Sequence, residues 1–184
     1  MKILMMVGSL RAGSWTRQLV DATVGLLPEH VEASYAVIGD LPHYSQDLDS
    51  ETPPQVVVDF RRAVEDSDAL VVATPEYNGS LPGVLKNAID WASRPRGSSA
   101  LDGTPVAVLS VSPSPRGAQW AREDAEKVLR VAGAELLGRS LGVASIHDTV
   151  VDGRIADPAI EDALRGLTAE LLAAGEDAAA RAAA

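Results

Sequence analysis

Short apolar runs recur along the chain, each bounded by glycine, proline or polar residues. The clearest are KILMMV at 2–7, ALVVAT at 69–74 and VAVLSV at 106–111. Runs of this length without polar alternation are typical of strands buried on both faces, as in a parallel sheet. Two weaker segments, 33–37 and 136–143, complete a predicted set of five strands.

Segments with apolar residues at the helical period lie between and after these runs. In the first of them, apolar side chains at 15, 19, 20, 24 and 27, together with Thr23, fall on one face of a helix. The alternation of strands and helices predicts a parallel sheet with helices on both faces. It favours an α/β, flavodoxin-like doubly wound fold with strand order 2-1-3-4-5. The predicted helices cover 15–27, 55–65, 83–93, 118–132 and 158–174.

Length and charge bound the class of protein. The 184 residues fit one domain, which we place at 1–175, with an alanine-rich tail at 176–184 expected to be frayed or disordered. The formal net charge of −10 disfavours binding to nucleic acid or to an anionic membrane surface. No apolar run approaches the ~20 residues of a membrane helix. The chain has no cysteine, which excludes disulfides and makes a cytoplasmic location the default expectation.

The turn after the first strand, GSLRAGS at 8–14, carries residue types that bind phosphate. It leads into a predicted helix, whose N-terminal N–H groups attract anions, and Ser9, Arg11 and Ser14 add donors that suit a phosphate dianion. Ser14 stands where a P-loop has lysine, and Leu10 where a dinucleotide fingerprint has glycine. A terminal monophosphate therefore fits better than either. The alternative is that Ser14 simply caps the helix.

A second unusual turn, TPEYNGSLPG at 74–83, follows the third strand. A proline, a tyrosine and an asparagine in one tight turn make a rigid platform suited to a planar ligand. In the predicted strand order, strands one and three end side by side at the switch point, where ligands of such sheets bind. The two turns are therefore expected to face one crevice. Taken singly, Asn78 is also an ordinary turn residue, and Lys86 is expected to face solvent.

The two turns together, GSLRAGS at 8–14 and PEYNGSLPGVLKNAIDW at 75–91, strongly resemble the NADPH-dependent FMN reductase family, which includes chromate, quinone and azo-dye reductases. The resemblance extends over roughly 2–135. It implies noncovalent FMN, NAD(P)H as co-substrate, no metal, and a homodimer or homotetramer with Trp91 near the subunit contact. By matching position it implies a phosphate site formed by Ser9, Arg11, Ser14 and Thr16. It likewise implies that the border of the isoalloxazine ring is formed by Pro75, Glu76, Tyr77 and Asn78.

Two positions depart from the family pattern. The turn after the fourth strand reads SPSPRGA at 112–118, where relatives commonly have a glycine-rich turn. It places Ser112 and Arg116 beside the expected flavin, and Arg116 or the backbone N–H groups of 112–117 are candidates for stabilising the negative charge of reduced flavin. Gly79 stands where many relatives carry an aromatic or larger residue, a change expected to open the pocket.

The predicted function is FMN-dependent NAD(P)H oxidoreduction, with electrons passed through the flavin to a small acceptor such as a quinone, an azo compound, a metal oxyanion or free flavin. The cofactor supplies this chemistry, so no acid–base residue is required. The chain has no Gly-x-Ser-x-Gly elbow, and His30, His43 and His147 lack metal-ligand spacing. Two alternatives remain: a flavodoxin-type electron carrier, whose phosphate loop usually has several Ser/Thr residues instead of arginine, and a flavin-binding protein with little turnover.

Overall fold

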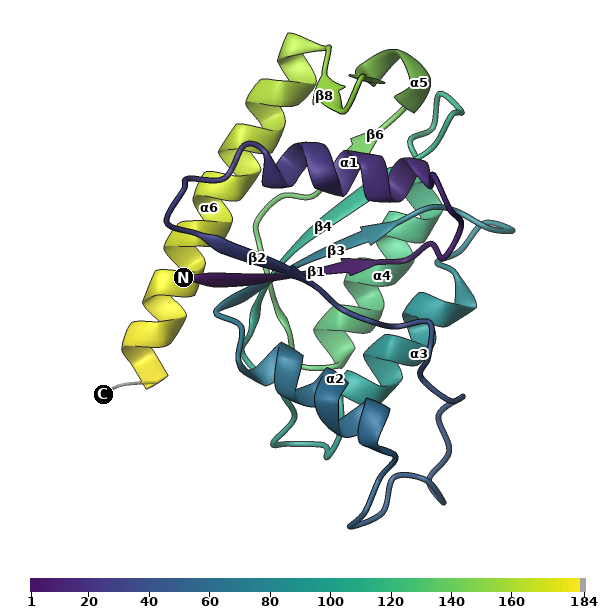
Figure 1. Ribbon diagram of the computed structural model, residues 1–184, viewed down its shortest axis with the longest axis vertical. Helices are drawn as coiled ribbons and strands as arrows, with labels where there is room; N and C mark the ends of the chain where they lie inside the picture. The colour runs from purple at the N-terminus through teal and green to yellow at the C-terminus, as the bar shows by residue number, and fades with distance from the viewer. Residues whose placement is uncertain (183–184) are drawn as a thin grey trace.

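The strands form a parallel sheet in the order β2-β1-β3-β4-β5, in a computed structural model that describes residues 1–182 (Figure 1). A further short strand, β6, also pairs with β4. This order and the α/β class confirm the sequence prediction. The strands are β1 Lys2–Val7, β2 Glu32–Tyr35, β3 Ala69–Thr74, β4 Pro105–Val111, β5 Glu135–Leu136 and β6 Leu141–Val143.

Helices cover both faces of the sheet, and the two faces follow from the alternation of side chains along each strand. On β1, for example, Leu4 and Met6 face the core beneath α2, α3 and α4, whereas Ile3 and Met5 face α1 and α6. Every residue of β3 and β4 is buried, which explains their unbroken apolar sequences. The helices are α1 Trp15–Val24, α2 Gln55–Glu65, α3 Gly83–Ala92, α4 Gln119–Val131, α5 Ile146–Thr149 and α6 Pro158–Ala182.

Between β4 and α6 the chain differs from the prediction in three ways. The single strand expected at 136–143 is divided into β5 and β6, because the chain leaves the ladder where the Gly138 N–H donates to Glu170 at 3.0 Å. A short helix, α5, and an antiparallel hairpin of β7 (Val150–Val151) and β8 (Arg154–Ile155) precede α6. No helix of residues 1–182 is long and apolar enough to cross a membrane.

Helix α6 continues to Ala182, so residues 176–182 are helical where a frayed or disordered tail was expected. Alanine has the highest helix propensity, and the Arg181 guanidinium pairs with the Glu135 carboxylate at 2.9 Å, which ties the end of the helix to the start of β5. Residues 183–184 of the expected tail lie outside the described residues.

Candidate functional site

The β1–α1 turn brings the end of β1 against β3 and then starts α1. The Gly8 N–H donates to the Ala73 carbonyl at 2.8 Å, and a Cβ on Gly8 would lie 3.0 Å from that oxygen, which leaves no room for a side chain. Gly13 has a φ of +66°, which glycine adopts without strain. Ser14 is buried and caps α1, since its Oγ accepts from the Arg17 N–H at 3.4 Å. The capping role weighed for Ser14 is therefore confirmed.

Arg11 is the cation of this turn. Its side chain is exposed, and its one hydrogen bond in the described structure is a 3.4 Å contact from Nη1 to the Ala12 carbonyl. Within residues 1–182 no carboxylate lies within ion-pair distance of Arg11. The guanidinium is thus available to an anion at the N-terminus of α1, where the first N–H groups of a helix have no intrahelical partner.

The three turns that follow β1, β3 and β4 enclose one cavity of about 300 Å³. Every predicted site residue lines it except Asn78 and Arg116. Three further lining residues were not predicted as site residues: one begins α1, and the other two flank Ser112 at the end of β4. The full lining is Ser9, Arg11, Ser14, Trp15, Thr16, Pro75, Glu76, Tyr77, Val111, Ser112 and Pro113.

The β3–α3 turn is a tight two-residue reversal. The backbones of Tyr77 and Ser80 exchange hydrogen bonds at 3.1 and 3.2 Å, and the two residues between them, Asn78 and Gly79, have φ values of +54° and +77°. Positive φ at both central positions defines a type I′ turn, for which Asn-Gly is the preferred pair. Asn78 therefore shapes the turn, while Tyr77 faces the cavity.

Two side chains attach this turn to α4. Glu76 Oε2 accepts from the Ala121 N–H at 3.2 Å, so a carboxylate stabilises the first turn of α4, as the helix dipole favours. Ser80 Oγ donates to Asp124 Oδ2 at 2.7 Å. Hydrogen bonds from Ser80 and then from Lys127 hold the pKa of the Asp124 carboxyl below its ordinary value. Glu76 thus has a structural partner as well as its place in the cavity wall.

Arg116 lies outside the cavity lining, with its guanidinium 5.0 Å from the centroid of the Trp120 ring. A Cβ on Gly79 would lie 3.4 Å from Cε3 of the same ring, so Trp120 occupies the space that glycine was expected to leave open. Sequence reasoning missed Trp120. Its signal was available, because it lies off the buried stripe of α4 that Ala121 and Ala125 define, which leaves its large ring without a place in the core of the domain.

The second half of the long motif is structural. Trp91 is fully buried in its own chain, its Nε1 donates to the Pro42 carbonyl at 2.7 Å, and its ring packs edge-on against Tyr44 at 4.9 Å. Its side chain therefore packs inside its own chain, and a subunit contact near Trp91 and the helix around it stays a prediction. Asn87 holds the same loop through Pro42 and Tyr44.

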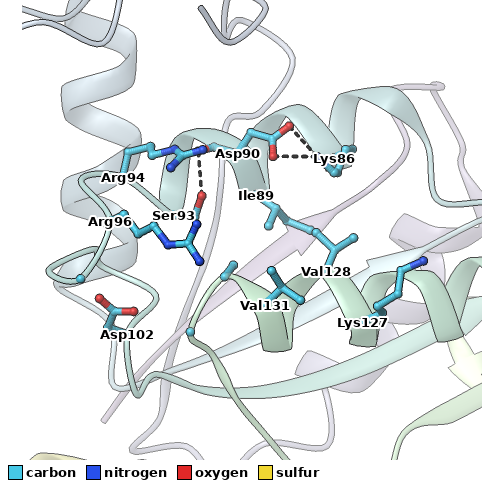
Figure 2. A pocket seen from close by; sticks show the side chains of 13 residues that line it. Lys86, Ile89, Asp90, Ser93, Arg94, Arg96, Asp102, Lys127, Val128 and Val131 are labelled. Carbon is cyan, nitrogen blue, oxygen red and sulfur yellow. Dashed lines mark hydrogen bonds and ion pairs between the residues drawn. The ribbon is translucent and has the colours of Figure 1, made fainter. Parts of the chain in front are cut away.

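A larger cavity of about 520 Å³ lies between the C-terminal halves of α3 and α4 (Figure 2). Helices of a parallel α/β sheet run opposite to the strands, so this cavity is at the other end of the sheet from the three turns. Lys86 at its rim is part exposed and pairs with Asp90 at 2.7 Å, as expected for a solvent-facing lysine. None of the predicted site residues lines it. Over residues 1–182 no group of three His, Asp or Glu side chains is placed to hold a metal ion.

The sheet order and the cavity at the switch point between β1 and β3 define a flavodoxin-like protein with a candidate nucleotide site. Residues 1–148 match the model of the NADPH-dependent FMN reductase family, and the chain belongs to that family.

Relatives with assigned activities share different portions of the chain. A 2-hydroxy-1,4-benzoquinone reductase from a Burkholderia species is 48% identical over 112 residues, which span 61% of this chain and 61% of that protein. A quinone reductase from Escherichia coli is 29% identical over 178 residues, 96% of this chain and 94% of that protein. The solved structure of FerB, a flavoenzyme NAD(P)H:(acceptor) oxidoreductase from Paracoccus denitrificans, superposes with a TM-score of 0.84 at 34% identity, covering 96% of this chain and 97% of FerB.

Proposed function

We propose that this protein is an FMN-dependent NAD(P)H oxidoreductase whose acceptors are small molecules of the quinone class. One observation carries the proposal: a single cavity joins the phosphate-type donors of the β1–α1 turn to the side chains of the β3–α3 and β4–α4 turns. The printed activities of the relatives, quinone reductases and an NAD(P)H:(acceptor) oxidoreductase, support the same reaction class.

The chemistry of the lining fits FMN. Ser9, Arg11 and the N-terminus of α1 would hold the phosphate, because hydroxyls, a guanidinium and helix N–H groups are its preferred donors. Arg11 has no acidic partner in the described structure, so it gives a local positive charge in a chain of net charge −10. Tyr77 and Pro113 offer flat apolar surface to the ring.

The reaction balances as NAD(P)H plus H⁺ plus quinone giving NAD(P)⁺ plus hydroquinone. FMN, when bound, supplies the two-electron carrier between the two substrates. The protein contributes phosphate binding through Arg11, walls that orient the ring, and a rigid β3–α3 turn held on α4 by Glu76 and Ser80. None of these tasks requires a side chain that exchanges protons.

The first test is a titration of FMN into protein that has been stripped of flavin, in which the loss of flavin fluorescence measures binding. In Arg11→Ala we expect the Kd for FMN to rise at least about tenfold, because a hydrogen bond from a charged group contributes roughly 1.5–3 kcal/mol. Arg154→Ala is the matched control, since it removes an exposed arginine on the β7–β8 hairpin, outside the cavity lining. Equal affinity in the two variants would contradict the phosphate assignment.

The second test is steady oxidation of NAD(P)H with a quinone by the FMN-loaded protein. Continuous turnover supports the enzyme. FMN binding without turnover would instead indicate a flavodoxin-type electron carrier or a flavin-binding protein. Failure to bind FMN at all would remove all three functions.

A homodimer or homotetramer and a cytoplasmic location belong to the same proposal. The location follows from the co-substrate, since cells keep NAD(P)H inside. Sedimentation equilibrium tests the oligomeric state, and a monomer would contradict the proposed homodimer or homotetramer. Cell fractionation tests the location, and recovery of the protein outside the cytoplasmic fraction would contradict it.

A further inference from the structure

Two exposed aromatic rings flank the β3–α3 turn. Tyr77 lines the cavity and keeps 54% of its surface exposed, and Trp120, on the first turn of α4, keeps 51% exposed. Trp120 packs beside Gly79, two residues from Tyr77 along the type I′ turn. Both rings therefore border the same turn, Tyr77 in the cavity wall and Trp120 beside Gly79.

Trp120 is held in place although it faces solvent. The bonds of Glu76 to Ala121 and of Ser80 to Asp124 fix the turn against two residues that follow Trp120 on α4. Gly79 lets the ring approach the turn closely, and its positive φ disfavours the side chain that would displace the ring. A rigidly supported indole loses little conformational entropy when a ligand packs on it, which favours binding at such a ring.

The charge beside the ring is positive. Arg116 is exposed, its guanidinium lies over Trp120 at 5.0 Å, and no ion pair of the described residues includes it. An exposed arginine outside any ion pair gives local positive charge on a surface of net charge −10, and it can attract an anion of matching shape. A flat ring next to a guanidinium complements a planar molecule with a negative charge at its edge.

We propose that Trp120 and Arg116 form the acceptor-binding platform and select planar quinones that carry a negative charge. This inference rests on the proposed function. A hydroxyl group on a quinone ring is a vinylogous carboxylic acid and is ionised at neutral pH, so hydroxyquinones belong to this class. The acceptor gains two electrons and two protons: NAD(P)H provides the hydride and water the second proton. Arg116 thereby acts on the acceptor, in place of the flavin role first considered for it.

A matched pair of redox-inert probes tests the platform apart from turnover. 2-Naphthoate and 2-naphthamide have the same ring and differ in charge, and calorimetry on the FMN-loaded protein gives the Kd of each. We expect the wild type to bind naphthoate more tightly. Arg116→Ala should weaken naphthoate binding about 3- to 5-fold and leave naphthamide unchanged, the range of an exposed ion pair. Arg154→Ala, which removes the same charge elsewhere, should change neither.

Trp120 variants test the aromatic half of the platform. Trp120→Ala should weaken both probes about 3- to 10-fold, the range of an aromatic contact, and Trp120→Phe should restore most of the loss. In steady-state assays of quinone reduction, Arg116→Ala should raise the KM for a hydroxybenzoquinone about 3- to 5-fold. This is the same factor by which the variant should raise the Kd for naphthoate. The KM for a methyl-substituted benzoquinone, measured in parallel, should rise less than the KM for the hydroxybenzoquinone.

The outcomes separate this inference from the proposed function. Loss of FMN binding or of all turnover in the wild type would remove both. Normal FMN binding and quinone reduction, with equal Kd values for the two probes in the wild type and in Arg116→Ala, would overturn the platform alone. If Trp120→Ala lowers the oligomeric state in sedimentation while probe binding is unchanged, the ring packs against a second copy and the platform is likewise overturned.

Discussion

Asn87 on helix α3 forms hydrogen bonds with the long loop between β2 and α2. Its replacement by alanine tests how much these hydrogen bonds contribute to the stability of the protein. Its Oδ1 accepts from the Tyr44 N–H at 2.8 Å, and its Nδ2 donates to the Pro42 carbonyl at 2.9 Å. The Pro42 carbonyl also accepts from Trp91 Nε1 at 2.7 Å, so it keeps one donor in the variant. The Tyr44 N–H loses its side-chain partner.

The expected loss follows from these two bonds. Each contributes about 1 kcal/mol net, so together they contribute about 2 kcal/mol. Alanine offsets up to about 0.7 kcal/mol of this, because it has a higher helix propensity than asparagine within α3. The free energy of unfolding should therefore fall by about 1.5 kcal/mol, and Tm by about 3–6 °C for a chain of this size.

Urea and thermal unfolding of Asn87→Ala measure the loss, with Lys86→Ala as control on the same helix. Lys86→Ala also introduces an alanine into α3, and it removes only a part-exposed ion pair with Asp90. That ion pair contributes at most about 0.5 kcal/mol. The Kd for FMN should stay unchanged in both, since neither residue lines the cavity beneath the three turns. A destabilisation of Asn87→Ala no larger than that of the control would refute the reasoning.

Three further predictions concern single side chains. Ser14→Ala should lower stability by about 0.5 kcal/mol and raise the Kd for FMN about 3- to 10-fold, whereas Ser14→Gly should keep most of the stability but show the same loss of affinity; wild-type affinity in both would exclude a phosphate contact. Burial and then the hydrogen bond with Asp21 raise the pKa of Tyr35 to about 12, so the stability that this phenol contributes is present below its ordinary value of 10.0 and is lost as pH rises through about 12. Asp21→Asn should lower that pKa in an absorbance titration, and an unchanged titration would contradict the assigned cause. Because Ser80 lowers the pKa of Asp124 from 3.8, the stability difference between wild type and Ser80→Ala should be full above pH 3.8 and shrink as pH falls through the lowered pKa; urea midpoints that differ equally at all pH values would count against it.

Local sequence patterns predicted most of the fold. The apolar runs predicted β1, β3 and β4 within a residue, and the strand–helix alternation predicted the sheet order. Such patterns predict structure well because residues that are near one another in the sequence determine these features. The features are the burial of a strand on both faces, the apolar face of a helix and the positive φ of a turn. The prediction failed at 136–143, where the outcome depends on a partner far along the chain, namely Glu170 for Gly138.

The site shows the same division. The sequence by itself determined that the turns after β1, β3 and β4 meet, because parallel strands in a known order end at one edge, and so it identified most of the cavity lining. Only the tertiary structure decided that Glu76 caps α4, that Trp120 fills the space beside Gly79, and that Arg116 lies on that ring. The first two pairings join the β3–α3 turn to helix α4, and the third joins the β4–α4 turn to the same helix. They depend on the distances between turns and on the direction of long side chains, which no periodicity within one segment encodes.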